Sequence, residues 1–125
     1  MSVHVVGAAI IRDGRVLAAR RTRPAGLAGG WEFPGGKVMP DESEQDALLR
    51  ECREELGVAV RVGERLGEVA DGAVRLVLYA ARVTEGEPEP LQDHDEVRWL
   101  GRADLAAIRW LPIDRALLPA VAALL

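Results

Sequence analysis

With 125 residues, of which 49% are apolar and 29% are charged, the chain can form one domain with a buried core and is too apolar for a disordered protein. The formal net charge of −4 argues against broad, non-specific binding to nucleic acids, but not against a small anionic substrate, because a bound cation can reverse the local field. The single cysteine, Cys52, excludes an internal disulfide and favours a reducing, cytoplasmic location.

The sequence predicts no membrane segment. It holds no run of 18 apolar residues, and its N-terminal stretch is too short and too polar at its end for a signal peptide. The apolar tail at 116–125 is too short to span a bilayer, so we expect an amphipathic helix packed on the domain.

The first third of the chain predicts strands and loops. Val3–Ile11 and residues 16–21 are strand-like, and the Asp13-Gly14 pair between them is typical of a hairpin turn. Residues 22–30, TRPAGLAGG, predict a loop. Residues 31–43, WEFPGGKVMPDES, predict a short strand that runs into a second loop.

A helix is predicted from Glu44 to Leu56. Ser43, with Asp46 three residues later, resembles a capping box, and Gly57 provides the C-terminal stop. The spacing predicts an apolar stripe of Leu48, Leu49, Cys52 and Leu56.

The second half of the chain again mixes strands and helices. Residues 58–69 and 74–83 predict strands, 84–96 a polar loop, and 96–105 a strand leading into a short helix with Gly101 as a candidate N-cap. Residues 111–125 predict one last helix with Asp114 as its N-cap. This order predicts an α/β domain whose helices cover both faces of a sheet.

The predicted helix carries an unusual density of carboxylates. Glu51, Glu54 and Glu55 fall at i, i+3 and i+4, on a face that we expect to lie opposite the apolar stripe. An acidic helix face is usually only solvated, but here the glycine-rich segment PGGK precedes it and can bring the backbone close to a ligand. Together these features predict a site for Mg²⁺ or Mn²⁺ and a phosphate group.

The same residues resemble the Nudix box, in which every fixed position is filled, with Cys52 where an aliphatic residue is usual. They are Gly36, Glu42, Arg50, Glu51, Cys52, Glu54, Glu55, Gly57 and Val58. The segments WEFPGGK, HDEVRWL and WLPIDRALL resemble the MutT branch of that family, so the resemblance covers nearly all of residues 1–125 as a single Nudix domain.

The resemblance implies a Nudix-type α/β/α sandwich with a central mixed β-sheet. It also implies hydrolysis of a nucleoside triphosphate to the monophosphate and pyrophosphate with Mg²⁺, for which Mn²⁺ can substitute. A Nudix hydrolase of another nucleoside diphosphate-linked substrate and a non-catalytic nucleotide-binding domain are the alternatives. The unbroken box argues against the second of these.

The resemblance also implies roles for single residues. Glu54, Glu55 and the carbonyl of Gly35 match metal ligands, and Glu51 matches either a ligand or the general base. Arg50 matches the residue that orients the glutamates, with Glu42 as its partner. Other residues carry weaker implications: Lys37 is a phosphate contact or a solvated lysine, and Asp93 is a further metal ligand or part of an acidic loop in which Asp95 and Glu96 compete for that role. His94 we expect on the surface rather than in catalysis.

The nucleobase site is the least determined part. Arg21 matches an arginine near the nucleotide or is a surface arginine, and Phe33 and Trp110 line the base pocket or pack in the core. Asp114 matches a position that reads the base edge. An ionised aspartate accepts from the amino group of cytosine but suits the O6 atom of guanine only when protonated.

Two substrate classes therefore remain: 8-oxo-dGTP, and CTP, dCTP or their 5-methyl forms. The expected role is nucleotide-pool sanitation, as in DNA repair, or cytidine metabolism. The sequence leaves open the number of metal ions and whether the protein is a monomer or a homodimer.

Overall fold

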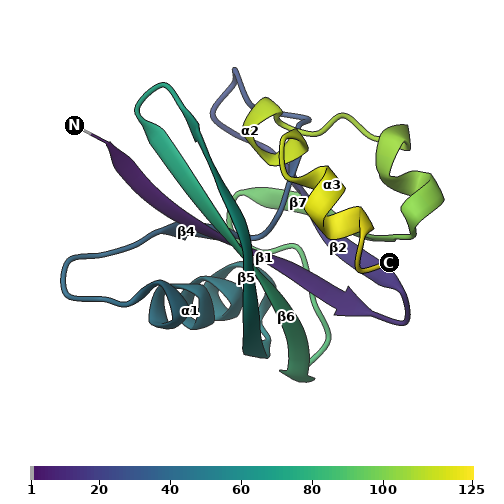
Figure 1. Cartoon of the computed structure of the whole chain (residues 1–125), viewed down its shortest axis with the longest axis horizontal. Helices are drawn as coiled ribbons and strands as arrows, with labels where there is room; N and C mark the ends of the chain where they lie inside the picture. Colours follow the sequence, from purple (N-terminus) through teal and green to yellow (C-terminus); the bar gives the residue numbers. More distant parts are fainter. Residues whose placement is uncertain (1) are drawn as a thin grey trace.

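The computed structural model describes residues 2–125, and within this range a seven-stranded mixed sheet lies between helices (Figure 1). Strand β1 is parallel to β6, and the other pairs are antiparallel. The strands follow the order β3-β2-β1-β6-β5, while β4 pairs with β1 and β7 with β2. Their bounds are β1 Val3–Arg12, β2 Arg15–Arg21, β3 Trp31–Glu32, β4 Gly35–Lys37, β5 Ala59–Asp71, β6 Val74–Glu85 and β7 His94–Leu100.

Alternation along β1 divides the core between the two faces of the sheet. Val6, Ala8 and Ile10 pack with helix α1 (Glu44–Leu56), whereas Ala9 packs with the C-terminal segment. That segment contains the 3₁₀ helix η1 (Arg102–Ala107) and helices α2 (Pro112–Arg115) and α3 (Leu118–Ala122). Helices therefore cover both faces of the sheet, as predicted.

Local sequence explains the elements that were predicted correctly. Asp13 and Gly14 both have positive φ, 53° and 73°, as a two-residue hairpin turn requires. The Ser43 hydroxyl accepts the N–H of Asp46 at 3.0 Å, which caps α1, and Gly57 ends the helix with a φ of 69°.

Leu49 is the error in the predicted apolar stripe. Leu48, Cys52 and Leu56 are buried at a spacing of four residues, but Leu49 is 42% exposed. It lies about 100° around the helix from Leu48, beyond the edge of the buried stripe.

The prediction of one last helix capped by Asp114 is wrong. Helix α2 begins at Pro112 after Leu111, and Asp114 lies buried inside its first turn. Pro119 lies in the first turn of a separate helix, α3, because a proline has no N–H to continue the preceding helix. Gly101 is the N-cap of η1, as predicted.

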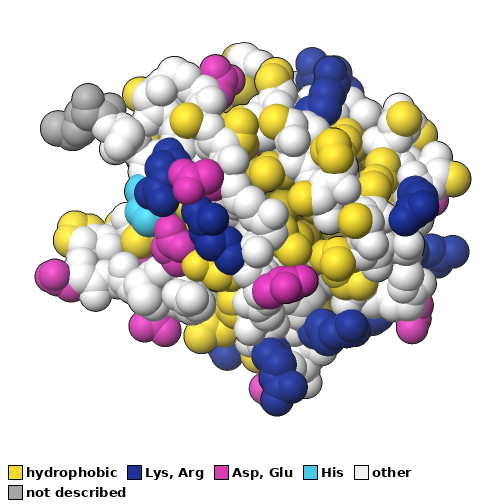
Figure 2. Space-filling model, in the orientation of Figure 1, with side chains coloured by type: hydrophobic (Ala, Val, Ile, Leu, Met, Phe, Trp, Pro, Cys, Tyr) yellow, Lys and Arg dark blue, Asp and Glu magenta, His cyan; other side chains and the backbone are white. Residues whose placement is uncertain are grey.

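No helix within residues 2–125 has both the length and the apolar character needed to cross a bilayer. On the face drawn in Figure 2, basic and acidic side chains are interspersed among hydrophobic ones rather than gathered into a patch of one sign.

Candidate active site

Arg50, in the middle of α1, connects the predicted box residues. Its Nε and Nη2 atoms donate to both carboxylate oxygens of Glu42, at 2.9 and 3.0 Å, and Nη2 also donates to the carbonyl of Lys37. Its Nη1 atom donates to Glu51 at 2.9 Å and, at 3.4 Å, to Glu54. The guanidinium holds the pKa of Glu42 down at about 2. Arg50 thus ties the loop before α1 to two glutamates of the helix.

Two glycines of β4 allow the backbone to approach these carboxylates. Gly35 has a φ of 153°, and a Cβ atom there would collide with the carbonyl oxygen of Val6. A Cβ atom at Gly36 would lie 2.5 Å from the carboxylate of Glu51. These glycines let the backbone of β4 approach Val6 and Glu51, and the approach to a ligand predicted for PGGK stays a prediction.

The three glutamates do not all lie opposite the apolar stripe, which corrects the prediction for Glu55. The Glu54 side chain is 41% exposed, whereas Glu55 is buried and accepts the N–H of Gly35 at 2.8 Å. Burial raises the pKa of Glu55 to about 8, and burial also raises the pKa of Glu51. A nearby cation would stabilise both charges, and an oxygen-only donor set fits a hard divalent ion.

His94, at the start of β7, enters this site, and its predicted surface position is wrong. Pairing of β7 with β2 buries the imidazole, whose Nε2 atom lies 2.9 Å from Glu32 Oε2. The same Glu32 oxygen accepts from Arg21 at 3.1 Å. His94 Nδ1 lies 4.0 Å from Glu55 Oε2. One ligand-type atom from each of Glu32, Glu55 and His94 lies within 4.8 Å of the others.

Sequence reasoning missed Glu32 as a site residue. The feature that could have indicated it is a glutamate inside the otherwise apolar WEF segment, followed at once by the glycines of the box. Its importance depends on β2 pairing with both β3 and β7, which places Glu32 and His94 on either side of one strand.

Arginines engage all three candidate acids around the start of β7. Asp93 pairs with Arg23 at 2.5 Å. An open cavity of about 650 Å³ is lined by this pair together with Thr22 and Gln92. The other two acids, Asp95 and Glu96, pair with Arg20 and Arg98 respectively. From this segment it is His94, rather than Asp93, whose side chain faces Glu55.

The candidate base-site residues divide into two groups. Phe33 and Trp110 stack with ring centroids 4.9 Å apart and are 3% and 2% exposed, which favours core packing over a base pocket. Asp114 is also buried and accepts the N–H of Phe33 at 3.0 Å, and burial raises its pKa to about 8. Arg21 is only partly exposed and is held by Glu32 and the carbonyl of Arg23, whereas Lys37 is exposed.

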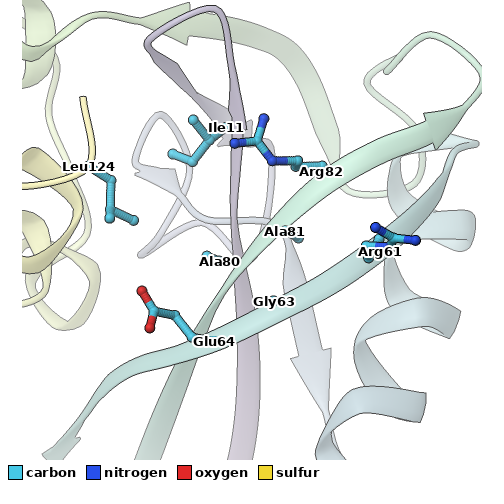
Figure 3. Close-up of a pocket in the computed structure, with 8 residues that line it drawn as sticks. All are labelled: Ile11, Arg61, Gly63, Glu64, Ala80, Ala81, Arg82 and Leu124. Atoms are coloured by element: carbon cyan, nitrogen blue, oxygen red, sulfur yellow. The ribbon is translucent and has the colours of Figure 1, made fainter.

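A second hollow, of about 330 Å³, lies on β5 and β6 near the C-terminus (Figure 3). Its lining includes Ile11, Arg61, Glu64, Arg82 and Leu124, and none of the predicted site residues.

Residues 1–121 match the NUDIX domain. The chain belongs to the Nudix hydrolase family. It is 44% identical, over 89% of its length and 82% of the relative's, to a candidate 8-oxo-dGTP diphosphatase 2 of Mycobacterium tuberculosis. It is 38% identical to the CTP pyrophosphohydrolase of Escherichia coli, over 98% of this chain and 93% of that one.

Solved structures support the same assignment for this Nudix hydrolase. The MutT NUDIX hydrolase of Burkholderia pseudomallei is 34% identical and superposes with a TM-score of 0.86, covering 97% of this chain and 98% of that chain. The predicted Nudix sandwich, the likeness to MutT proteins and the assignment as an enzyme of the hydrolase class are confirmed.

Proposed function

We propose that this Nudix hydrolase converts a nucleoside triphosphate to the monophosphate and pyrophosphate with Mg²⁺. The observation that carries the proposal is the array around Arg50, in which one guanidinium fixes Glu51 and Glu54 beside the glycine backbone that binds Glu55. Glu51, Glu54, Glu55 and the carbonyl of Gly35 would hold the ion, which neutralises phosphate charge and lowers the pKa of water; Mn²⁺ can take its place.

Glu51 has two candidate roles in this proposal, metal ligand and general base. The raised pKa of Glu51 and its hydrogen bond from Arg50 support the role of general base. A carboxylate accepts a proton more readily when its pKa lies nearer to the working pH. Arg50 acts as a positioning residue for it.

For the nucleobase we propose 8-oxo-dGTP as the leading substrate, with cytosine nucleotides as the second candidate. A carboxyl with a pKa of about 8 is largely protonated at neutral pH, so Asp114 would donate to the O6 atom of an oxidised guanine. The relatives named above support both classes, since one is named for 8-oxo-dGTP and one for CTP. The corresponding role is nucleotide-pool sanitation in the cytoplasm, by a monomer or a homodimer.

The test is pyrophosphate release with Mg²⁺ from 8-oxo-dGTP, dGTP, CTP, dCTP and 5-methyl-dCTP, measured side by side at low concentration. The highest kcat/KM for 8-oxo-dGTP supports the leading substrate, and the highest value for the cytosine set supports an ionised Asp114. Release from none of them contradicts the proposed reaction.

A further inference from the structure

A buried histidine nitrogen without a partner lies next to the box glutamates. His94 is fully buried at its side chain, and its Nδ1 atom has no hydrogen-bond partner among the described residues. The Oε2 atom of Glu55 lies 4.0 Å from Nδ1, too far for a hydrogen bond. A buried polar atom of this kind costs stability unless something binds it.

The other nitrogen of His94 determines what that partner can be. Its Nε2 atom lies 2.9 Å from Glu32 Oε2, and Glu32 also accepts from Arg21. An ionised carboxylate can only accept, so the proton of a neutral imidazole resides on Nε2. The lone pair is then on Nδ1, the atom that lies 4.0 Å from Glu55 Oε2. A carboxylate that fixes a histidine through its far nitrogen is the usual support of a metal-ligating imidazole.

The distance and the charges also suit a cation. Zinc bonds to imidazole nitrogen and to carboxylate oxygen are both about 2.1 Å, so one ion bridges atoms from ~3.4 Å apart at a tetrahedral angle to ~4.2 Å when linear. The observed 4.0 Å exceeds the tetrahedral separation by about 0.6 Å, a gap that a small rotation of the Glu55 side chain would close. Glu32 and Glu55 together carry two negative charges when ionised, and Arg21 offsets only one of them.

We propose that His94 Nδ1 and Glu55 Oε2 bind a first-row transition ion of the zinc type, with Glu32 as the orienting partner. This site differs from the proposed Mg²⁺ site in using a nitrogen ligand and in excluding Glu51 and Glu54. Because both sites need Glu55, a zinc ion here withdraws a ligand from Mg²⁺ and makes the enzyme sensitive to zinc.

The test is a Zn²⁺ titration of the nucleotide-free protein at pH 8, followed by NMR of the imidazole nitrogens. We expect the Nδ1 resonance of His94 to shift and to saturate at one equivalent, whereas Mg²⁺, which would bind Glu55 without bonding to the imidazole, shifts it much less. His4 provides a matched control, because it is the other histidine of the chain and its Nε2 atom also lies against a glutamate, Glu44, at 2.6 Å. Cys52 is a poor competitor, since burial raises the pKa of its thiol to about 12.

Variants give a second measurement. His94→Gln and Glu32→Gln should each weaken Zn²⁺ binding by about 10- to 100-fold, while His4→Gln leaves it unchanged. An Nδ1 resonance of His94 that does not respond to Zn²⁺ overturns the proposal, and so does full zinc affinity in a folded His94→Gln protein. The NMR result on the unaltered chain decides the matter if a variant fails to fold. Neither measurement involves turnover, so its outcome is independent of the proposed reaction.

Discussion

Glu55 and Asp114, both buried acids, accept hydrogen bonds from neighbouring positions of one short segment. The N–H of Gly35 binds Glu55 and the N–H of Phe33 binds Asp114. One stretch of backbone therefore connects the carboxylate proposed to hold metal with the carboxylate proposed to read the base. If both proposals hold, the WEFPGGK segment supports the residues at both ends of the substrate.

Glu54 provides the most direct test of the metal assignment at the level of one residue. Glu54→Gln should lower kcat by about 100-fold or more, because it removes a charge proposed to bind the metal. Because the Glu54 side chain is partly exposed, the substitution should leave the unfolding free energy nearly unchanged. Steady-state kinetics under saturating Mg²⁺ check this, with Asp46→Asn, an exposed acid of the same helix, as the control. Near-normal turnover of Glu54→Gln would show that Glu54 is not a metal ligand.

Asp114→Asn tests how the base is read. An asparagine offers an N–H₂ donor at every pH, as the protonated aspartic acid does at neutral pH, and its carbonyl can still accept from Phe33. We therefore expect the variant to keep or increase the preference for 8-oxo-dGTP over dCTP. In the parent protein this preference should fall as the pH rises from 7 to 9, whereas in the variant it should stay constant. Parallel kcat/KM profiles would leave Asp114 with only a structural role.

At the level of elements, α1 and the loop before it depend on Arg50. Arg50→Lys replaces a planar fork with a single ammonium group, which cannot bind both oxygens of Glu42 and also reach Glu51. We expect the unfolding free energy to fall by about 1–2 kcal/mol, together with a lower kcat. Urea denaturation and kinetics measure the two effects. Arg53→Lys, an exposed arginine of the same helix, should change neither.

The sequence predicted those elements that local interactions determine. Helix α1 has its cap, its apolar spacing and its terminal glycine within residues 43–57, and the hairpin turn depends on two adjacent residues. Leu49 and the break at Pro119 are local errors, whereas the failures for His94 and Asp114 involve contacts between distant segments. His94 is buried because β7 pairs with β2, and Asp114 is engaged by Phe33, 81 residues away. The resemblance to the Nudix box implied roles for Glu54 and Glu55, but it did not show that Glu55 is buried and Glu54 exposed.

At the level of the whole molecule, the buried acids should make stability depend on pH. The pKa of Asp114 is raised from 3.8 to about 8 in the folded chain. The contribution of Asp114 to the unfolding free energy is therefore complete below pH ~4 and is lost as the pH rises to about 8. Glu55 acts in the same direction. Glu42 acts in the opposite direction, because its lowered pKa makes stability fall as the pH drops from about 4.5 to about 2. The metal-free protein should therefore be most stable in mild acid.

Urea denaturation of the metal-free protein between pH 5 and pH 8 checks this dependence. We expect the unfolding free energy to decrease over this interval and Asp114→Asn to make the slope shallower by up to about 1.4 kcal/mol per pH unit. A flat profile, or an equal slope in the variant, would contradict a protonated Asp114.

The measurement that tests the central claim most directly is the identification of the products formed from 8-oxo-dGTP with Mg²⁺, by anion-exchange chromatography. The proposed reaction predicts the nucleoside monophosphate and pyrophosphate in equal amounts, with neither formed when the ion is removed by a chelator. Formation of the diphosphate and orthophosphate, or turnover that persists without a divalent ion, would contradict the roles assigned to Glu51, Glu54 and Glu55.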